Sequence, residues 1–183
     1  MSHNILLVED EALISMDESQ ILKKHGFEVL PAYSGEKAVE FALSEADISL
    51  VLMDIDLGSG IDGTTAAERI LHEKELPIVF LTSHSEKEYV DKVKRITNYG
   101  YVLKNSGEFV LIESIHMAFQ LFTSHRRLKN ARDEYLSVVE LTGEIINRVD
   151  NEGRIIFVNS RACEFWHTTE EELLGKRYID FVH

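Results

Sequence analysis

The feature that most constrains the fold is an alternation, over residues 4–123, of short apolar runs with longer stretches of helical character. The five apolar runs cover residues 5–8, 27–30, 48–53, 78–81 and 100–103. They are almost continuously apolar, which is typical of strands that are covered on both faces. Strands that alternate with helices in this way predict an α/β fold with a doubly wound, five-stranded parallel sheet.

Capping residues and glycines place the helices between these runs. We expect a first helix over residues 11–25 that ends before Gly26, and a second helix that Ser34 caps. Further helices are expected over residues 64–74 and 85–96, the last of them capped by Ser85. Pro77 opens the fourth strand, where a missing N–H group is tolerated.

Polar side chains stand at the carboxyl ends of four of these runs. Glu9 and Asp10 follow the first run and Asp54 follows the third, while Thr82 and Lys104 follow the fourth and fifth. Open α/β sheets place their sites at the carboxyl ends of parallel strands, so we expect these side chains to meet. Together they offer metal ligands, a nucleophilic carboxylate, a hydroxyl and a fixed cation. That set suits phosphoryl transfer onto an aspartate.

Residues 4–123 resemble the receiver domain of two-component response regulators. The motifs are Val8-Glu9-Asp10, Leu52-Met53-Asp54, Leu81-Thr82-Ser83 and Tyr101-Val102-Leu103-Lys104. The resemblance implies a flavodoxin-like fold for a domain over residues 1–123. It also implies that Asp54 is the phosphoacceptor, supplied by a sensor histidine kinase or a phosphotransfer protein in a cytoplasmic phosphorelay.

The resemblance further implies a metal ion beside the acceptor. Mg²⁺, or Mn²⁺ in its place, would be held by Glu9, Asp10, Asp54 and the backbone carbonyl of Asp56. Oxygen ligands of this kind are the ones that Mg²⁺ prefers. A bound cation also offsets the repulsion among grouped carboxylates, which favours the same interpretation.

Other residues receive roles in stabilisation and switching by the same resemblance. Lys104 would pair with the phosphoryl oxygens and the Thr82 hydroxyl would donate to one of them. Movement of Thr82 would let Tyr101 rotate inward, which makes a two-state switch. Asp56 and His84, each two residues beyond a site residue, are candidates for tuning the phosphoryl lifetime; solvated rim positions are the equal alternative.

The sequence departs from the receiver pattern in two loops. Asn105 follows Lys104 where receivers usually carry proline, and a cis bond without proline costs about 3 kcal/mol. The loop over residues 58–63 contains three glycines and is one residue longer than usual, so we expect it to be mobile.

The stretch over residues 108–141 contains no proline or glycine, which predicts one long helix. Its second half, a linker over residues 124–142, continues a stripe with heptad spacing. The stripe comprises Met117, Leu121, Ser124, Leu128, Ala131, Tyr135 and Val138. We expect a homodimer that pairs through a coiled coil of this linker helix and through the receiver face; a solvated linker helix is the alternative to the coiled coil.

Residues 143–183 resemble the N-terminal part of a PAS domain. The motifs are Asp150-Asn151-Glu152-Gly153-Arg154-Ile155, Phe157-Val158-Asn159 and Glu171-Glu172-Leu173-Leu174-Gly175-Lys176. We expect a partial α+β domain: a hairpin over residues 144–158 and helices over residues 160–166 and 169–174, with the chain stopping inside the domain. The sequence does not identify a PAS ligand.

Composition excludes several classes of function. The net charge of −13 argues against a general nucleic-acid surface. The longest apolar runs are far shorter than the roughly 18 residues of a membrane span. Cys163 is the single cysteine and no signal peptide is visible at the start, which suits the cytoplasm.

Two alternatives to a signalling receiver stay open. Asp54-Ile55-Asp56 also resembles the nucleophile motif of haloacid-dehalogenase phosphatases, in which Asp54 would be the nucleophile and Asp56 the general acid. A protein-binding adaptor that is never phosphorylated is the other. We favour a phospho-accepting switch over a metabolic enzyme, with an output module, such as a histidine kinase, beyond His183.

Overall fold

The structure is a computed structural model, and it describes residues 3–45, 47–83, 96 and 99–181. The chain divides into two compact units, Met1–His125 and Arg126–His183. Each unit has hydrophobic clusters of its own.

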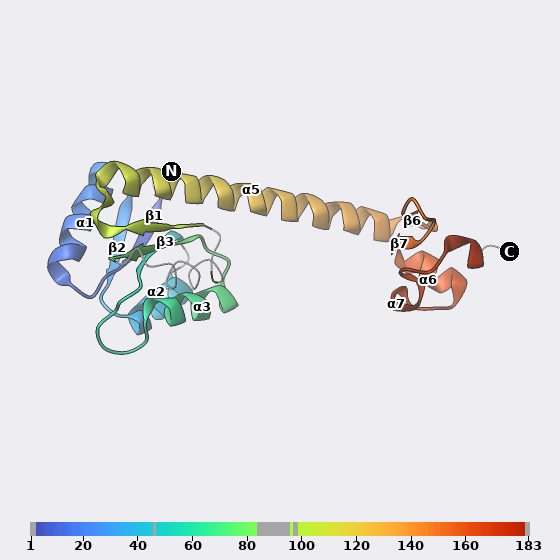
Figure 1. The fold of residues 1–183 in the computed structure, drawn as a ribbon, viewed down its shortest axis with the longest axis horizontal. Helices are drawn as coiled ribbons and strands as arrows, with labels where there is room; N and C mark the ends of the chain where they lie inside the picture. Colours follow the sequence, from blue (N-terminus) through green and yellow to red (C-terminus); the bar gives the residue numbers. More distant parts are fainter. Residues whose placement is uncertain (1–2, 46, 84–95, 97–98, 182–183) are drawn as a thin grey trace. The chain divides into compact units, whose positions relative to one another are not determined.

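Unit 1 contains the predicted five-stranded sheet, and every neighbouring pair of strands is parallel (Figure 1). The strands are β1 (Asn4–Val8), β2 (Glu28–Ala32), β3 (Ile48–Asp54), β4 (Ile78–Thr82) and β5 (Tyr101–Leu103). Their order is β2-β1-β3-β4-β5, which confirms the doubly wound topology. This order puts the end of β3 beside the ends of β1 and β4.

Both faces of the sheet are buried because successive strand residues point to opposite sides. Leu6 and Val8 of β1 join a cluster with side chains of α2 and α3. Ile5 and Leu7 join the second cluster, with side chains of α1 and α5. The near-continuous apolar character of the runs therefore follows from helices on both faces.

The helices of unit 1 begin close to the predicted positions. They are α1 (Ala12–Lys24), α2 (Gly35–Ser44) and α3 (Gly63–Glu73), followed by the start of α5 (Glu108–Leu141). Ser34 caps α2 as predicted, accepting a hydrogen bond from the Lys37 N–H group. Asp62 caps α3 in the same way through the Thr65 N–H group, at 2.7 Å. The helix expected over residues 85–96, with its cap Ser85, lies outside the described residues except for Ile96.

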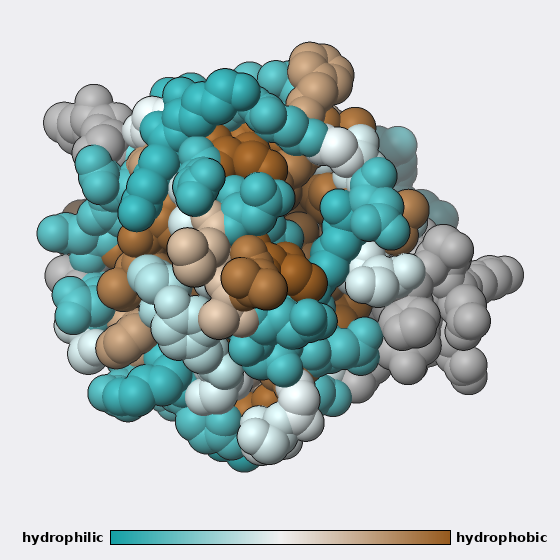
Figure 2. All heavy atoms as spheres, turned by 90° about the vertical axis from the view of Figure 1, so that its left-hand side faces the viewer, coloured by the Kyte–Doolittle hydropathy of each residue, from teal (hydrophilic) through white to brown (hydrophobic). Residues whose placement is uncertain are grey.

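The carboxyl ends of the strands lie at the left of Figure 1, where β5 leads into the start of α5. Figure 2 views the molecule from that side. Hydrophilic side chains cover most of this face and surround a smaller group of apolar ones near its centre. The site expected at the strand ends therefore opens onto a mostly polar surface.

The predicted long helix is present as α5, which runs unbroken for 34 residues. The apolar side chains of the heptad stripe are exposed, from 42% for Leu121 to 70% for Leu128. Exposure of the stripe in a single chain does not test whether two such helices pair, so the coiled coil stays a prediction. None of the helices in the described part of the chain has an apolar stretch long enough to cross a membrane.

Unit 2 contains the predicted hairpin and two short helices. The antiparallel strands are β6 (Asn147–Val149) and β7 (Ile155–Val158), and the helices are α6 (Ser160–Trp166) and α7 (Glu170–Leu173). Buried Asn159 ties these parts together. Its side chain accepts from the N–H groups of Ile146 and Ala162, and donates to the carbonyls of Val139 and Glu144. The PAS assignment stays a prediction.

Candidate functional site

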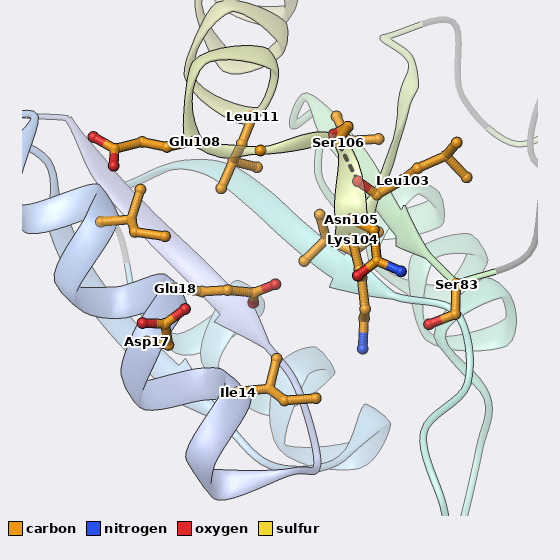
Figure 3. A pocket seen from close by; sticks show the side chains of 14 residues that line it. Ile14, Asp17, Glu18, Ser83, Leu103, Lys104, Asn105, Ser106, Glu108 and Leu111 are labelled. Atoms are coloured by element: carbon orange, nitrogen blue, oxygen red, sulfur yellow. Dashed lines mark hydrogen bonds between the residues drawn. The ribbon is translucent and has the colours of Figure 1, made fainter.

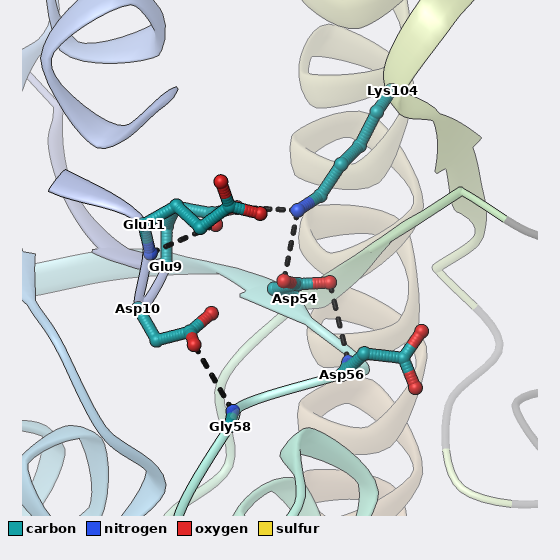
Figure 4. Close-up of polar contacts among 7 residues, drawn as sticks. All are labelled: Glu9, Asp10, Glu11, Asp54, Asp56, Gly58 and Lys104. Carbon is teal, nitrogen blue, oxygen red and sulfur yellow. Dashed lines mark hydrogen bonds and ion pairs between the residues drawn. The ribbon is translucent and has the colours of Figure 1, made fainter. Parts of the chain in front are cut away.

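The ends of β1, β3 and β5 bring four predicted site residues together (Figure 4). Glu9, Asp10 and Asp54 each offer a carboxylate oxygen, and these oxygens lie within 4.8 Å of one another. Glu9 and Asp54 are buried, whereas Asp10 is exposed. This is a set of hard oxygen donors with one open side, as a divalent cation such as Mg²⁺ requires.

Lys104 reaches into the site from the end of β5. Its Nζ lies 2.6 Å from Glu9 Oε2 and 2.8 Å from Asp54 Oδ2. The lysine side chain is 13% exposed, so both ion pairs are largely removed from water. Breaking a buried pair leaves an uncompensated charge, which makes Lys104 important to the stability of the site.

Backbone N–H groups orient the three carboxylates. Glu9 Oε1 accepts from Glu11 at 3.2 Å and Asp54 Oδ1 accepts from Asp56 at 3.3 Å. Asp10 Oδ2 accepts from Gly58 at 3.1 Å. The third contact joins the end of β1 to the loop after β3, so it fixes one carboxylate relative to another strand.

Two glycines make this close approach possible. A Cβ atom on Gly58 would lie 2.8 Å from Asp10 Oδ2. A Cβ atom on Gly63 would overlap the backbone carbonyl oxygen of Asp54. Glycine at these positions therefore lets the backbone pass directly against the acidic residues.

Burial and the ion pairs with Lys104 act in opposite directions on the pKa values of the site. Burial raises the pKa of Glu9 and of Asp54, although the hydrogen bonds from Lys104 act in the opposite direction. Burial alone would lower the pKa of Lys104, but its hydrogen bonds to Asp54 and Glu9 raise it overall. An added cation would stabilise both carboxylates in the ionised form.

Of the remaining predicted residues, Thr82, Tyr101 and Asp56 lie in the described part of the chain. Thr82 ends β4 and is buried, while Tyr101 opens β5, pairs in register with Phe80 and is 38% exposed. Asp56 is exposed, just beyond the end of β3. His84 lies outside the described residues.

The two unusual loops have defined geometry. No cis peptide bond occurs among the described residues, and Lys104–Ser106 forms a single 3₁₀ turn. The glycine-rich loop after β3 is tied to α2 by the Ile61 N–H group, which donates to Glu36 Oε1 at 2.9 Å. That hydrogen bond lowers the pKa of Glu36.

Glu18, on α1, is a buried acid that the sequence motifs did not single out. Only 8% of Glu18 is exposed, and its Oε2 atom has no hydrogen-bond partner among the described residues. Burial, followed by the charges of Glu9 and Asp54, raises its pKa to about 7. Its position four residues after Ile14 and four before Leu22, on the buried side of the helix, was the available signal.

The comparisons with known proteins agree with this geometry. Residues 5–116 match the family described as "Response regulator receiver domain". The transcriptional regulatory protein PdtaR of Mycobacterium tuberculosis is 36% identical over 120 residues, which cover 64% of this chain and 57% of PdtaR. This chain therefore spans little more than half of the length of that relative.

Two solved structures are similar to unit 1. One is the N-terminal domain of a response regulator/sensory box/GGDEF 3-domain protein from Carboxydothermus hydrogenoformans. It is 43% identical with a TM-score of 0.62, covering 67% of this chain and 98% of that one. The other is the BeF3-activated N-terminal receiver domain of Klebsiella pneumoniae RstA, 28% identical with a TM-score of 0.59, covering 64% and 98%.

Proposed function

This chain belongs to the response regulator receiver family, and on that premise we propose that Asp54 accepts a phosphoryl group in two-component signalling. The observation that carries the proposal is the cluster of Glu9, Asp10 and Asp54 with Lys104 at the carboxyl ends of the strands. Acceptance from a phosphohistidine forms a bond between an Asp54 oxygen and phosphorus. The bond from phosphorus to the donor imidazole breaks, and its electron pair stays on the imidazole nitrogen.

The donor set suits Mg²⁺, or Mn²⁺ in its place. Glu9, Asp10, Asp54 and the backbone carbonyl of Asp56 would hold the ion. When bound, the ion would neutralise charge on the carboxylates and on the incoming phosphoryl group. The raised pKa values of Glu9 and Asp54 support a site that is completed by a cation.

Lys104 and Thr82 would stabilise the transferred group. Lys104 already lies 2.8 Å from Asp54 Oδ2, so a small movement would bring its ammonium group to a phosphoryl oxygen. Thr82, on the neighbouring strand, would donate its hydroxyl to another oxygen. Its movement would open space for Tyr101, and Asp56 and His84 would tune how long the phosphoryl group persists.

We further propose that α5 carries the phosphorylation state to a PAS module. The receiver would occupy residues 1–123, the linker residues 124–142 and the PAS segment residues 143–183. The Carboxydothermus protein joins a response regulator to a sensory box, which supports this order. The chain would form a homodimer through the linker and the receiver face, and the exposed heptad stripe supports the pairing of the linker. A flexible insertion in the linker should then uncouple the two modules.

The donor would be a sensor histidine kinase or a phosphotransfer protein, in the cytoplasm. Exposed apolar side chains on α1, Leu13 at 82% and Met16 at 58%, support a protein contact beside the site. No nucleic-acid partner is proposed, since the chain carries a net charge of −13.

Intact mass after incubation with acetyl phosphate and Mg²⁺ tests the proposal. One added phosphoryl group is expected on the native chain, and none on Asp54→Asn or with a chelator present. Asp47→Asn, which alters an exposed acid just before β3, is the matched control and should still be phosphorylated. Steady phosphate release without an adduct would favour the haloacid-dehalogenase type of phosphatase. Neither adduct nor release would favour an adaptor that is never phosphorylated.

A further inference from the structure

A pocket of about 370 Å³ lies between α1 and the turn that joins β5 to α5 (Figure 3). Its apolar wall contains Ile14 and Ile21 from α1, Val102 from β5 and Leu111 from α5. Its volume lies within the range of about 300–1,000 Å³ found for small-molecule sites. The pocket is therefore large enough for a small organic compound.

Glu18 points into this pocket from α1 (Figure 3), and its Oε2 atom has no hydrogen-bond partner among the described residues. The side chain is more than nine-tenths buried, so water has little access to the unpartnered Oε2 atom. A buried acceptor without a hydrogen bond destabilises the folded chain. A ligand that places positive charge and a donor beside the carboxylate would reduce that cost.

The lysine that lines the pocket is already engaged. Lys104 lines the pocket but directs its ammonium group to Glu9 and Asp54. Glu108, at the pocket rim, is paired with Lys24 at 2.8 Å. Asp17 adds a further acid to the lining. The lining therefore presents carboxylates in excess, which favours a ligand with positive charge.

We propose that this pocket binds a small organic cation, consisting of one primary ammonium or guanidinium group on a short aliphatic stem. The cationic group donates to the Glu18 carboxylate, and the stem packs against the apolar wall formed by Ile14, Ile21 and Leu111. Binding does not depend on phosphoryl acceptance at Asp54. Because Lys104 lines both sites, occupancy should also change the rate of that reaction, and this consequence alone rests on the proposed function.

The proposal is tested by titrating the full ¹⁵N-labelled chain with n-butylammonium and with n-butylguanidinium at pH 8. Amides of α1 and of residues 104–108 should shift in a saturable way with either cation. 1-Butanol and butyrate, which keep the stem but lack the positive charge, should leave these amides in place. A lysine in the middle of a short peptide presents the same ammonium group as n-butylammonium. Comparing the binding of the peptide with that of the free amine therefore distinguishes a free compound from the basic side chain of a protein as the ligand.

Matched variants assign the binding to Glu18. Glu18→Gln keeps the size of the side chain but removes its charge, and should weaken binding about tenfold to a hundredfold. Glu68→Gln, the same substitution at an exposed position of α3 outside the pocket, should change the affinity less than about threefold, since exposed charges contribute little. The proposal is overturned if neither cation shifts the pocket amides, if 1-butanol binds equally well, or if Glu18→Gln binds like the native chain. The readout is binding, so failure of phosphorylation would not be mistaken for failure here.

Discussion

Replacing Glu18 by glutamine should stabilise unit 1 in a manner that depends on pH. In the folded chain the pKa of Glu18 is about 7, against an ordinary value of 4.5. That difference corresponds to about 3 kcal/mol of cost when the carboxylate is ionised in its buried position. The variant Glu18→Gln carries no charge at any pH and avoids this cost.

The sign of the effect follows from proton binding. Between pH 4.5 and about 7 the folded state holds the Glu18 proton more tightly than the unfolded state. The native chain therefore loses stability as the pH rises through this window, and the loss levels off above it. The advantage of Glu18→Gln should be less than about 1 kcal/mol at pH 5 and about 3 kcal/mol at pH 8.

Native-state hydrogen exchange of β1 and β3 amides measures this difference for unit 1 alone, with a chelator present to exclude metal effects. Asp17→Asn, an exposed acid on the same helix, is the control and should shift stability by less than about 0.5 kcal/mol at either pH. An equal gain from Glu18→Gln at pH 5 and pH 8 would refute the assignment of a buried, titrating carboxyl to Glu18.

Three further variants test individual contacts. Lys104→Met removes the partner of two buried carboxylates and should lower the free energy of unfolding by about 3–5 kcal/mol without metal, measured by urea titration. Gly63→Ala pushes a methyl group onto the Asp54 carbonyl and should cost about 1–3 kcal/mol, whereas Gly143→Ala, which meets open space, should cost under about 1. Asn159→Ala removes four hydrogen bonds in unit 2 and should reduce the chemical-shift dispersion of the amide resonances of that unit. Asn151→Ala, at an exposed position, should leave the amide spectrum of unit 2 unchanged.

The sequence was sufficient to predict the sheet and most of the acidic cluster. Each buried strand is a short apolar run, so a polar residue that directly follows such a run in the sequence must lie at the end of a strand. Asp54, Asp10 and Lys104 lie far apart in sequence, but the parallel topology brings the ends of their strands to one edge. The prediction succeeded because the local sequence shows which residues lie at strand ends, and the parallel topology then brings the carboxyl ends of neighbouring strands together.

Contacts that depend on tertiary packing were not predicted. Glu18 lines one pocket together with residues of β5 and of the turn that follows it, which are distant in sequence, and no local pattern specifies that. The hydrogen bonds of Glu36 to Ile61 and of Asp10 to Gly58 also join segments that are distant in sequence. An acid at an apolar position of a helix signals an unusual residue, but only the packed structure shows what surrounds it.

The most direct measurement locates the phosphoryl group on the chain. After treatment with acetyl phosphate and Mg²⁺, borohydride would reduce the acyl phosphate, and tandem mass spectrometry of the peptides would identify the reduced residue. We predict that reduction occurs at Asp54 and disappears when a chelator is present. Reduction at Asp10 or Asp56, or reduction that does not require the metal, would contradict the assignment of Asp54 as the phosphoacceptor.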